Sequence, residues 1–145
     1  MKTFNNILVV SRSTQHCIKV LRTGIALARK FDARLHVLHI IHDPFNLNGW
    51  NLPIPSLEEE YKTMVANSRN ELNRIIEMER AEGLVINEWV KDGDPVAAIA
   101  QAVESEQVDL ILMLAHREGR LEHFLFGKTN DAIIRRLPAS LMLVR

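Results

Sequence analysis

The chain of 145 residues is 47% hydrophobic and 25% charged, which fits a globular domain that can bury a core. Its 18 basic residues balance its 18 acidic residues, so the positive field typical of nucleic-acid binders is missing. One cysteine, Cys17, excludes an internal disulfide, and no apolar stretch approaches the roughly 20 residues that span a bilayer. We therefore expect one cytoplasmic domain over residues 1–145, with no nucleic-acid or membrane partner.

The first third of the chain alternates apolar runs with an amphipathic segment. The continuous run Ile7–Val10 predicts a strand covered on both faces of a parallel sheet. The polar string Ser11–Thr14 follows and can cap a helix, whose apolar residues recur at helical spacing from Ile18 to Ala28. A second apolar run, Leu35–Ile41, predicts the second strand.

The middle of the chain repeats this alternation. A capping box at Ser56–Glu59 opens the longest helical pattern, which Gly83 ends. The half-polar segment Leu84–Val90 predicts a strand at a sheet edge. Asp94-Pro95 then suits a helix start, with Asp as the cap and Pro at the first helical position, and Val108–Leu112 predicts a fourth strand.

The last quarter reads as strand, loop, short helix and strand, closing with the apolar run Leu141–Val144. Right-handed crossovers turn such an alternation of strands and helices into an open, doubly wound parallel α/β sheet. These sheets bind ligands at the carboxyl ends of their strands, where the winding direction switches. If strands one and four are neighbours, the chemistry should lie where they end.

The segment Gly127-Lys128-Thr129 resembles the end of a phosphate-cradling P-loop. Glu122 stands where that motif requires a glycine, and Gly127 follows the fourth strand only after a long connection, so a true P-loop is not expected. Free N–H groups at a helix start, beside a lysine and a hydroxyl, still favour an anion. The alternative is that Thr129 only caps the helix and Lys128 is solvated.

Neither a metal site nor an enzyme is indicated. His36, His39 and His42 recur every third residue, which in a strand places them on alternating faces and argues against a shared metal. The hydroxyl, thiol and imidazole groups lack a nucleophile-elbow motif, so we expect no catalysis. His116, after the fourth strand, is the best single candidate for chemistry, with a hydrogen-bonded structural histidine as the alternative.

The order and spacing of several local patterns resemble the universal stress protein domain over essentially the whole chain. These patterns are Ile7–Val10, Leu38-His39-Ile40, Gly93-Asp94-Pro95 with Ile99 and Ala102, Asp109-Leu110-Ile111, Gly127, and Arg136-Leu137-Pro138. The resemblance implies a five-stranded parallel sheet with helices on both faces and strand order 3-2-1-4-5. It also implies dimers, often paired through the last strand, here Leu141–Val144.

Many members of that family bind ATP through a glycine pattern that falls here on Leu114, Arg117 and Gly127-Lys128, so only its last glycine is kept. The family's acidic residue after the first strand falls on Arg12, and a guanidinium can only donate hydrogen bonds. Side chains replace glycines where the backbone must approach a phosphate. The resemblance thus implies a degraded ATP site, with no nucleotide or with another anionic ligand. The candidate binding residues are Val10, Ser11, Arg12, Ile40, Leu114, His116, Arg117, Gly127, Lys128 and Thr129.

Three functional hypotheses follow. The leading one is a noncatalytic cytoplasmic stress-response module that forms a homodimer and binds a ligand or an unidentified protein partner. The second is a switch that holds ATP or a related nucleotide in the same crevice, with weak nucleotide hydrolysis left open. The third is a carrier of an apolar or amphipathic ligand, suggested by Trp50, Met113, Leu114, Phe124 and Phe126. Patterns such as Ala115-His116 are also similar to the divergent E-type branch of the family, which occurs as tandem domains.

Overall fold

The protein is an α/β layered structure, described by a computed structural model for residues 4–12, 16–41, 55–115, 135 and 139–145, with the backbone alone for residues 55–58 and 61. In chain order its elements are β1 (Asn6–Ser11), α1 (Cys17–Phe31), β2 (Arg34–Ile41), α2 (Pro55–Ala81), β3 (Ile86–Asp92), α3 (Pro95–Glu106), β4 (Leu110–Leu114) and β5 (Ser140–Val144). None of these described helices is long and apolar enough to cross a membrane.

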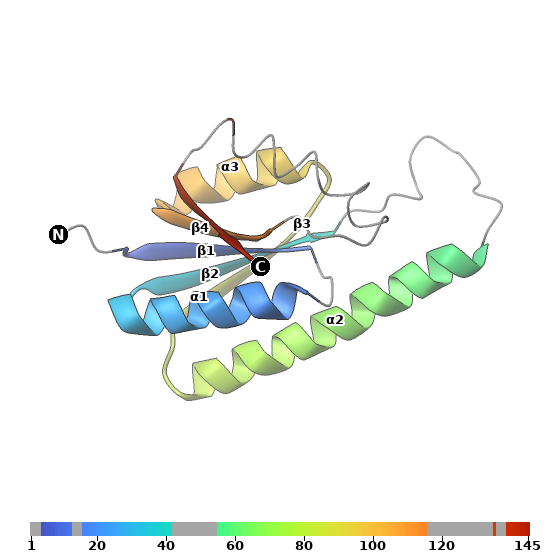
Figure 1. Cartoon of the computed structure of the whole chain (residues 1–145), viewed down its shortest axis with the longest axis horizontal. Helices are drawn as coiled ribbons and strands as arrows, with labels where there is room; N and C mark the ends of the chain where they lie inside the picture. The colour runs from blue at the N-terminus through green and yellow to red at the C-terminus, as the bar shows by residue number, and fades with distance from the viewer. Residues whose placement is uncertain (1–3, 13–15, 42–54, 116–134, 136–138) are drawn as a thin grey trace.

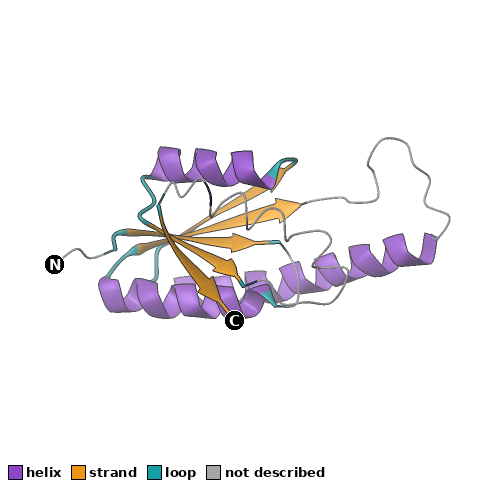
Figure 2. Ribbon diagram, turned by 45° about the horizontal axis from the view of Figure 1, so that its top comes forward, coloured by secondary structure: helices purple, strands orange, loops and turns teal. Residues whose placement is uncertain are grey.

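The five strands form one parallel sheet in the order β3-β2-β1-β4-β5, which confirms the predicted architecture. Helices α1 and α2 cover one face and α3 covers the other (Figures 1 and 2). The amino-terminal part of helix α2 extends beyond the carboxyl edge of the sheet (Figure 1). The chain therefore winds in both directions from β1, and the switch lies between β1 and β4.

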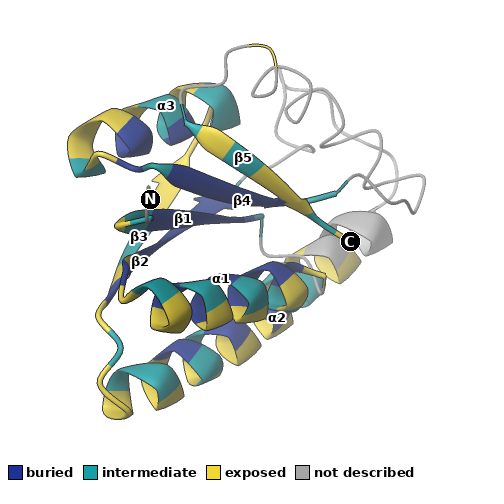
Figure 3. Ribbon diagram, turned by 60° about the vertical axis from the view of Figure 1, so that its left-hand side comes forward, coloured by how far each residue is buried: buried dark blue, intermediate teal, exposed yellow. Residues whose placement is uncertain are grey.

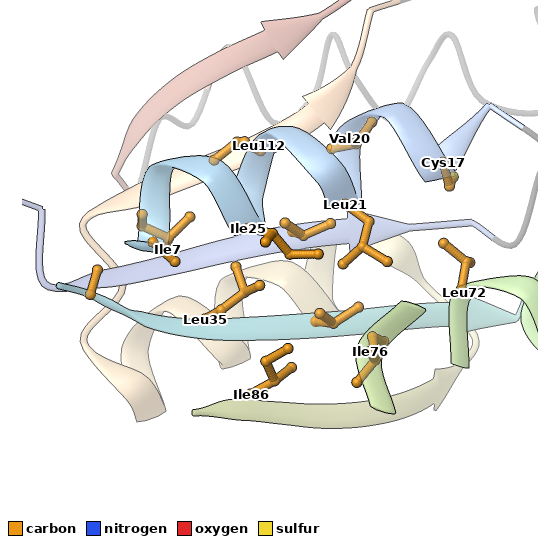
Figure 4. Close-up of a cluster of buried hydrophobic side chains, with 14 of the residues drawn as sticks. Ile7, Cys17, Val20, Leu21, Ile25, Leu35, Leu72, Ile76, Ile86 and Leu112 are labelled. Carbon is orange, nitrogen blue, oxygen red and sulfur yellow. The ribbon is translucent and has the colours of Figure 1, made fainter. Parts of the chain in front are cut away.

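Alternate residues of each central strand pack into two different cores. Ile7 and Val9 join the cluster beneath α1 and α2, whereas Leu8 and Val10 join the cluster beneath α3. The first cluster fills the space between the sheet and the two helices (Figure 4). Burial of each such side chain contributes about 1.5–3 kcal/mol, so the central strands dominate the stability of the sheet. The colours of Figure 3 show the same gradient, with the interior strands buried and β5 largely exposed.

Local sequence signals predicted one helix start correctly and two incorrectly. Asp94 caps α3 by accepting a hydrogen bond from the Val96 amide at 3.1 Å, with Pro95 in the first helical position. Helix α2 instead begins at Pro55, so Ser56 lies inside the first turn and the predicted capping box is wrong. Proline with its fixed φ is favoured at the first helical position, and this preference wins here. The N-cap of α1 is His16, which makes no side-chain cap bond, so the string from Ser11 does not supply the cap.

Asp109 joins the amino ends of β1 and β4. Its two carboxylate oxygens accept hydrogen bonds from the backbone amides of Asn5 at 2.8 Å and Asn6 at 3.2 Å. The Asp109 amide in turn donates to the Asn6 carbonyl at 3.0 Å. Three hydrogen bonds thus fix which strand lies beside β1 and in which register.

Helix α1 lies unusually close to β1 at Gly24. A Cβ atom added to Gly24 would lie 2.4 Å from Val9 Cγ2 and 3.3 Å from Leu35 Cδ1. A β-branched side chain in a packed core has few other rotamers, so Val9 cannot easily move aside. The glycine therefore sets the distance between the helix and the sheet.

We predict that Gly24→Ala lowers the free energy of unfolding by up to about 2 kcal/mol, because overpacking costs about 1–3 kcal/mol and alanine regains about 1 kcal/mol of helix propensity. Denaturant unfolding measures the difference. In a Val9→Ala background the same change should cost nothing or stabilise, because the clashing methyl group is gone. An equal loss in both backgrounds would contradict the close contact.

Candidate functional site

The candidate site lies where β1 and β4 end, at the switch in winding direction. The two strands pair in parallel from Ile7 with Leu110 to Val9 with Leu112, and continuing this register brings Ser11 level with Leu114. The predicted adjacency of the first and fourth strands is confirmed. Residues a hundred positions apart therefore meet at one edge of the sheet, as open α/β folds require for a ligand crevice.

The predicted binding residues on the strands divide between the two faces of the sheet. Val10 and Ile40 are buried in the core beneath α3, so their side chains pack within the core that supports this edge of the sheet. Ser11 is also buried, and Leu114 packs partly against the core beneath α1. Met113, named above for an apolar carrier, is buried beneath α3.

The remaining predicted residues lie outside the described part of the chain. This holds for His116, Arg117, Gly127, Lys128 and Thr129, and for the side chains of Trp50, Phe124 and Phe126. Their assignment to the crevice stays a prediction from the sequence.

Arg12 is the charged group at the end of β1. Its backbone amide donates a hydrogen bond to Cys17 Sγ at 3.3 Å, which holds the turn from β1 into α1. Burial lowers the pKa of the Arg12 guanidinium to about 10, with Cys17 acting in the opposite direction. The group still carries its charge at pH 7. A poorly solvated cation at a sheet edge favours an anion as its neighbour.

A buried polar network joins β2, β3 and α2, and the sequence analysis did not find it. His39 is fully buried beneath α2, and its Nε2 atom lies 2.9 Å from Glu88 Oε2. Glu88 Oε1 in turn lies 3.0 Å from Arg80 Nη1, and Arg80 also donates to the Ile86 carbonyl. His39 Nδ1 is buried without a hydrogen-bond partner among the described atoms. This network attaches the long helix to the edge strand.

His36 lies on the opposite face and has a different environment. Its ring stacks on Trp89, with centroids 5.3 Å apart and planes 5° from parallel. Its Nε2 atom lies 3.2 Å from Asn6 Oδ1, and its Nδ1 atom lies 3.4 Å from Asn87 Nδ2. The predicted placement of His36 and His39 on opposite faces is confirmed. Among the described residues no three His, Cys, Asp or Glu side chains form a group that could hold a metal.

These features define a class of protein, the open α/β domains with a crevice at the switch between the two halves of a parallel sheet. The model of the universal stress protein family matches residues 3–145, so the chain belongs to that family. A putative universal stress protein of Staphylococcus haemolyticus is 24% identical over 147 residues, covering 100% of this chain and 87% of that protein.

Two solved structures show the same fold. Universal stress protein UspA from Lactobacillus plantarum has a TM-score of 0.73 at 16% identity, with 100% of both chains covered. A universal stress protein family protein from Arabidopsis thaliana, solved with AMP bound, has a TM-score of 0.59 at 14% identity, covering 97% of this chain and 90% of that one.

The two buried histidines make stability depend on pH. Burial is the main cause that lowers the pKa of both His36 and His39 below the usual 6.5. Glu88 raises the pKa of His39, and Arg69 lowers it further. Glu106 raises the pKa of His36, and Arg34 lowers it further. Below pH 6.5 these two histidines therefore bind protons in the unfolded chain but stay neutral in the folded chain. Stability that is complete above pH 6.5 is lost as the pH falls toward the folded-state pKa values.

We predict that the free energy of unfolding falls below pH 6.5 with a slope of up to about 1.4 kcal/mol per pH unit for each histidine. His36→Gln and His39→Gln should each reduce the slope, and the double variant should reduce it by the sum, because the two rings lie on opposite faces of the sheet. Urea unfolding between pH 4.5 and 7.5 measures this. Equal slopes in the parent and the double variant would be the contrary result.

Proposed function

We propose that the protein is a noncatalytic cytoplasmic module that acts in the stress response by dimerisation and by binding an anionic ligand in the crevice at the ends of β1 and β4. The observation that carries the proposal is the position of Arg12. Arg12 follows the last residue of β1 at the switch in winding direction, and burial lowers the pKa of its guanidinium to about 10. A bound phosphate or carboxylate would accept charge-assisted hydrogen bonds from this cation.

The residue types at the crevice argue against the usual ATP arrangement of the family. Leu114 stands where the family's pattern has a glycine, so the chain lacks the residue that would let a phosphate approach the backbone most closely. Arg12 replaces a carboxylate and cannot accept a hydrogen bond from a ribose or an adenine. A ligand with a phosphate or carboxylate directed at Arg12 fits these groups better.

The described polar groups near the crevice support binding rather than turnover. Cys17 Sγ accepts a hydrogen bond from the Arg12 amide and stabilises the turn after β1. The His39 ring is directed to Glu88 within the core, and its environment lowers its pKa. Both groups therefore have structural roles.

The proposed homodimer forms through β5, the strand at one edge of the sheet. Within Ser140–Val144 no residue is charged, and Met142 and Leu143 are 37% and 44% exposed. The opposite edge strand β3 carries Glu88, Lys91 and Asp92. Charge on an edge strand discourages pairing and an apolar edge invites it, so β5 is the edge suited to a second copy of the chain.

A second candidate function is a nucleotide-binding switch in the same crevice. It is favoured by the Arabidopsis thaliana relative, which holds AMP. A phosphate of such a nucleotide could pair with Arg12 even where the glycine pattern is incomplete. The nucleotide would then alter the affinity for the dimer partner or for another protein.

Native mass spectrometry of the freshly purified protein distinguishes these functions. The mass of a bare dimer supports the interaction module, an added nucleotide mass supports the switch, and an added lipid-like mass supports the carrier. A monomer mass would contradict the dimer of the leading proposal.

We predict that ATP, AMP or inorganic phosphate at about 100 times its dissociation constant stabilises the protein by about 2.7 kcal/mol, which is an increase in Tm of roughly 5–10 °C. Arg12→Gln should abolish most of this increase. Arg22→Gln, which removes the same charge from an exposed position on α1, should retain it. No increase with any of the three ligands at millimolar concentration would exclude the nucleotide switch, and equal increases in both variants would exclude Arg12 as the anion site.

We predict that Met142→Lys weakens the dimer at least tenfold, which corresponds to about 1.4 kcal/mol, because it places a charge on the pairing edge. Met78→Lys makes the same chemical change at a methionine that is 63% exposed on α2 and should leave the dimer intact. Sedimentation velocity at micromolar concentration measures both. A monomeric parent protein would refute the proposed dimer.

A further inference from the structure

A groove lies beside β3, the edge strand opposite β5, on the face of the sheet away from α1 and α2. It has a volume of about 110 Å³ and lies between β2, β3 and α3. Its apolar lining residues are Leu38, Trp89, Ala98 and Ala102. Such a space holds a few waters or one aliphatic side chain. The groove lies on the other side of the sheet from His39 and outside the crevice at β1 and β4.

The groove adjoins backbone groups of β3 that point away from the sheet. The Leu35 amide donates to the Val85 carbonyl, so Val85 faces β2 and Ile86 faces outward. Arg80 confirms this direction, because its guanidinium donates to the Ile86 carbonyl from outside the sheet. By the same alternation the N–H and C=O groups of Glu88 and Val90 point outward. Beyond the position covered by Arg80, no described residue bonds to these outward backbone groups, so the edge can pair with another strand.

Two opposite charges line the groove at different levels along β3. Glu106 and Trp89 line the groove together, and the Trp89 ring stacks on His36, which pairs with Asn87 in the sheet. The opposing effect of Glu106 on the pKa of His36 agrees with this position. Lys91 also lines the groove, four residues further along β3, which is about 13 Å at the rise of an extended strand. Trp89 lies midway between these two levels. Asn87, Trp89 and Lys91 face the same side of the sheet because strand side chains alternate, and Glu106 lines the groove from the end of α3.

We propose that this edge of the sheet binds an extended peptide segment of a partner protein, in which an apolar residue lies between a basic and an acidic residue, each two positions away. The peptide adds a sixth strand beside β3 and places its apolar side chain in the groove. Its acidic side chain pairs with Lys91 and its basic side chain with Glu106. Main-chain bonds supply affinity, and the groove and the two charges supply specificity, as in other cases of strand addition.

The spacing of the groove favours this occupant over a second copy of the chain. A peptide strand directs every second side chain to one face, so its first, third and fifth residues match the levels of Asn87, Trp89 and Lys91. Lys91 and Glu106 discourage a second copy of β3 from adding to this edge, but both can form ion pairs with a segment of complementary charge. The site is separate from the crevice and from β5, so it does not depend on the proposed function.

The test uses three seven-residue threonine peptides with valine at the fourth position, and fluorescence polarisation as the readout. The mixed peptide has lysine and glutamate at its second and sixth positions, the basic peptide has two lysines, and the acidic peptide has two glutamates. The parent protein should bind the mixed peptide at least tenfold more tightly than either of the others. No binding of the mixed peptide at 1 mM overturns the proposal.

Charge reversal in the protein makes the test specific. Lys91→Glu leaves two acidic groups beside the groove, so this variant should prefer the basic peptide by about tenfold. Lys19→Glu makes the same change in net charge at an exposed position on α1 and should keep the preference for the mixed peptide. An identical preference in both variants overturns the proposal.

The position of the peptide can be read from amide NMR signals. Binding should shift the signals of Glu88, Val90 and Asp92, and shifts confined to Leu141–Val144 would show that the peptide uses the other edge and would overturn the proposal. N-methylation of the peptide tests the direction of pairing. The lysine at the second position lies at the level of Glu106 only when the peptide runs parallel to β3, because antiparallel pairing would place that lysine beside Lys91. Methyl groups on the peptide nitrogens of the second, fourth and sixth residues should therefore abolish binding, whereas those of the third and fifth residues should not. Undiminished binding of the first methylated peptide also overturns the proposal.

Discussion

The pairing of β1 with β4 is the constraint on which the rest of the structure depends, and the Asp109 carboxylate fixes it. Asp109 accepts hydrogen bonds from the amides of Asn5 and Asn6 at the start of β1. Hydrogen bonds to a charged group contribute about 1.5–3 kcal/mol each, more than most single contacts in a domain. Because this pairing also determines the register, it brings the end of β1 beside the end of β4 and so creates the crevice.

The fold could be predicted from the sequence because its signals are local or periodic. The apolar runs identified the central strands, and the Asp94-Pro95 pair identified the start of α3. The prediction was wrong at the start of α2, where Pro55 and Ser56 give competing signals one residue apart. The strand after Gly83 begins two residues later than predicted, at Ile86, because the half-polar residues there carry no clear period.

The site could be predicted only in outline, because side-chain roles depend on which face of a strand is covered. The sequence located the ends of β1 and β4, and strand alternation places Val10 and Ser11 on opposite faces, but it did not show that Val10 is the one that faces α3. The contact between His39 and Glu88 joins residues 49 positions apart, which no local pattern reveals. A histidine within an apolar strand, followed by a glutamate in the next strand, was the signal available, and it indicates a buried hydrogen bond rather than a metal site.

The two edges of the sheet differ in chemistry, and this difference separates two kinds of association. β5 has exposed apolar side chains and no charge, so it suits a surface that is always covered by an identical strand. β3 is covered by Arg80 at its amino end and bordered by Lys91 and Glu106 beside the groove, so it resists an identical strand. Only a segment of matching charge recovers the cost of desolvating these groups. A dimer at β5 would thus leave β3 available, and partner binding at one edge need not disturb the other.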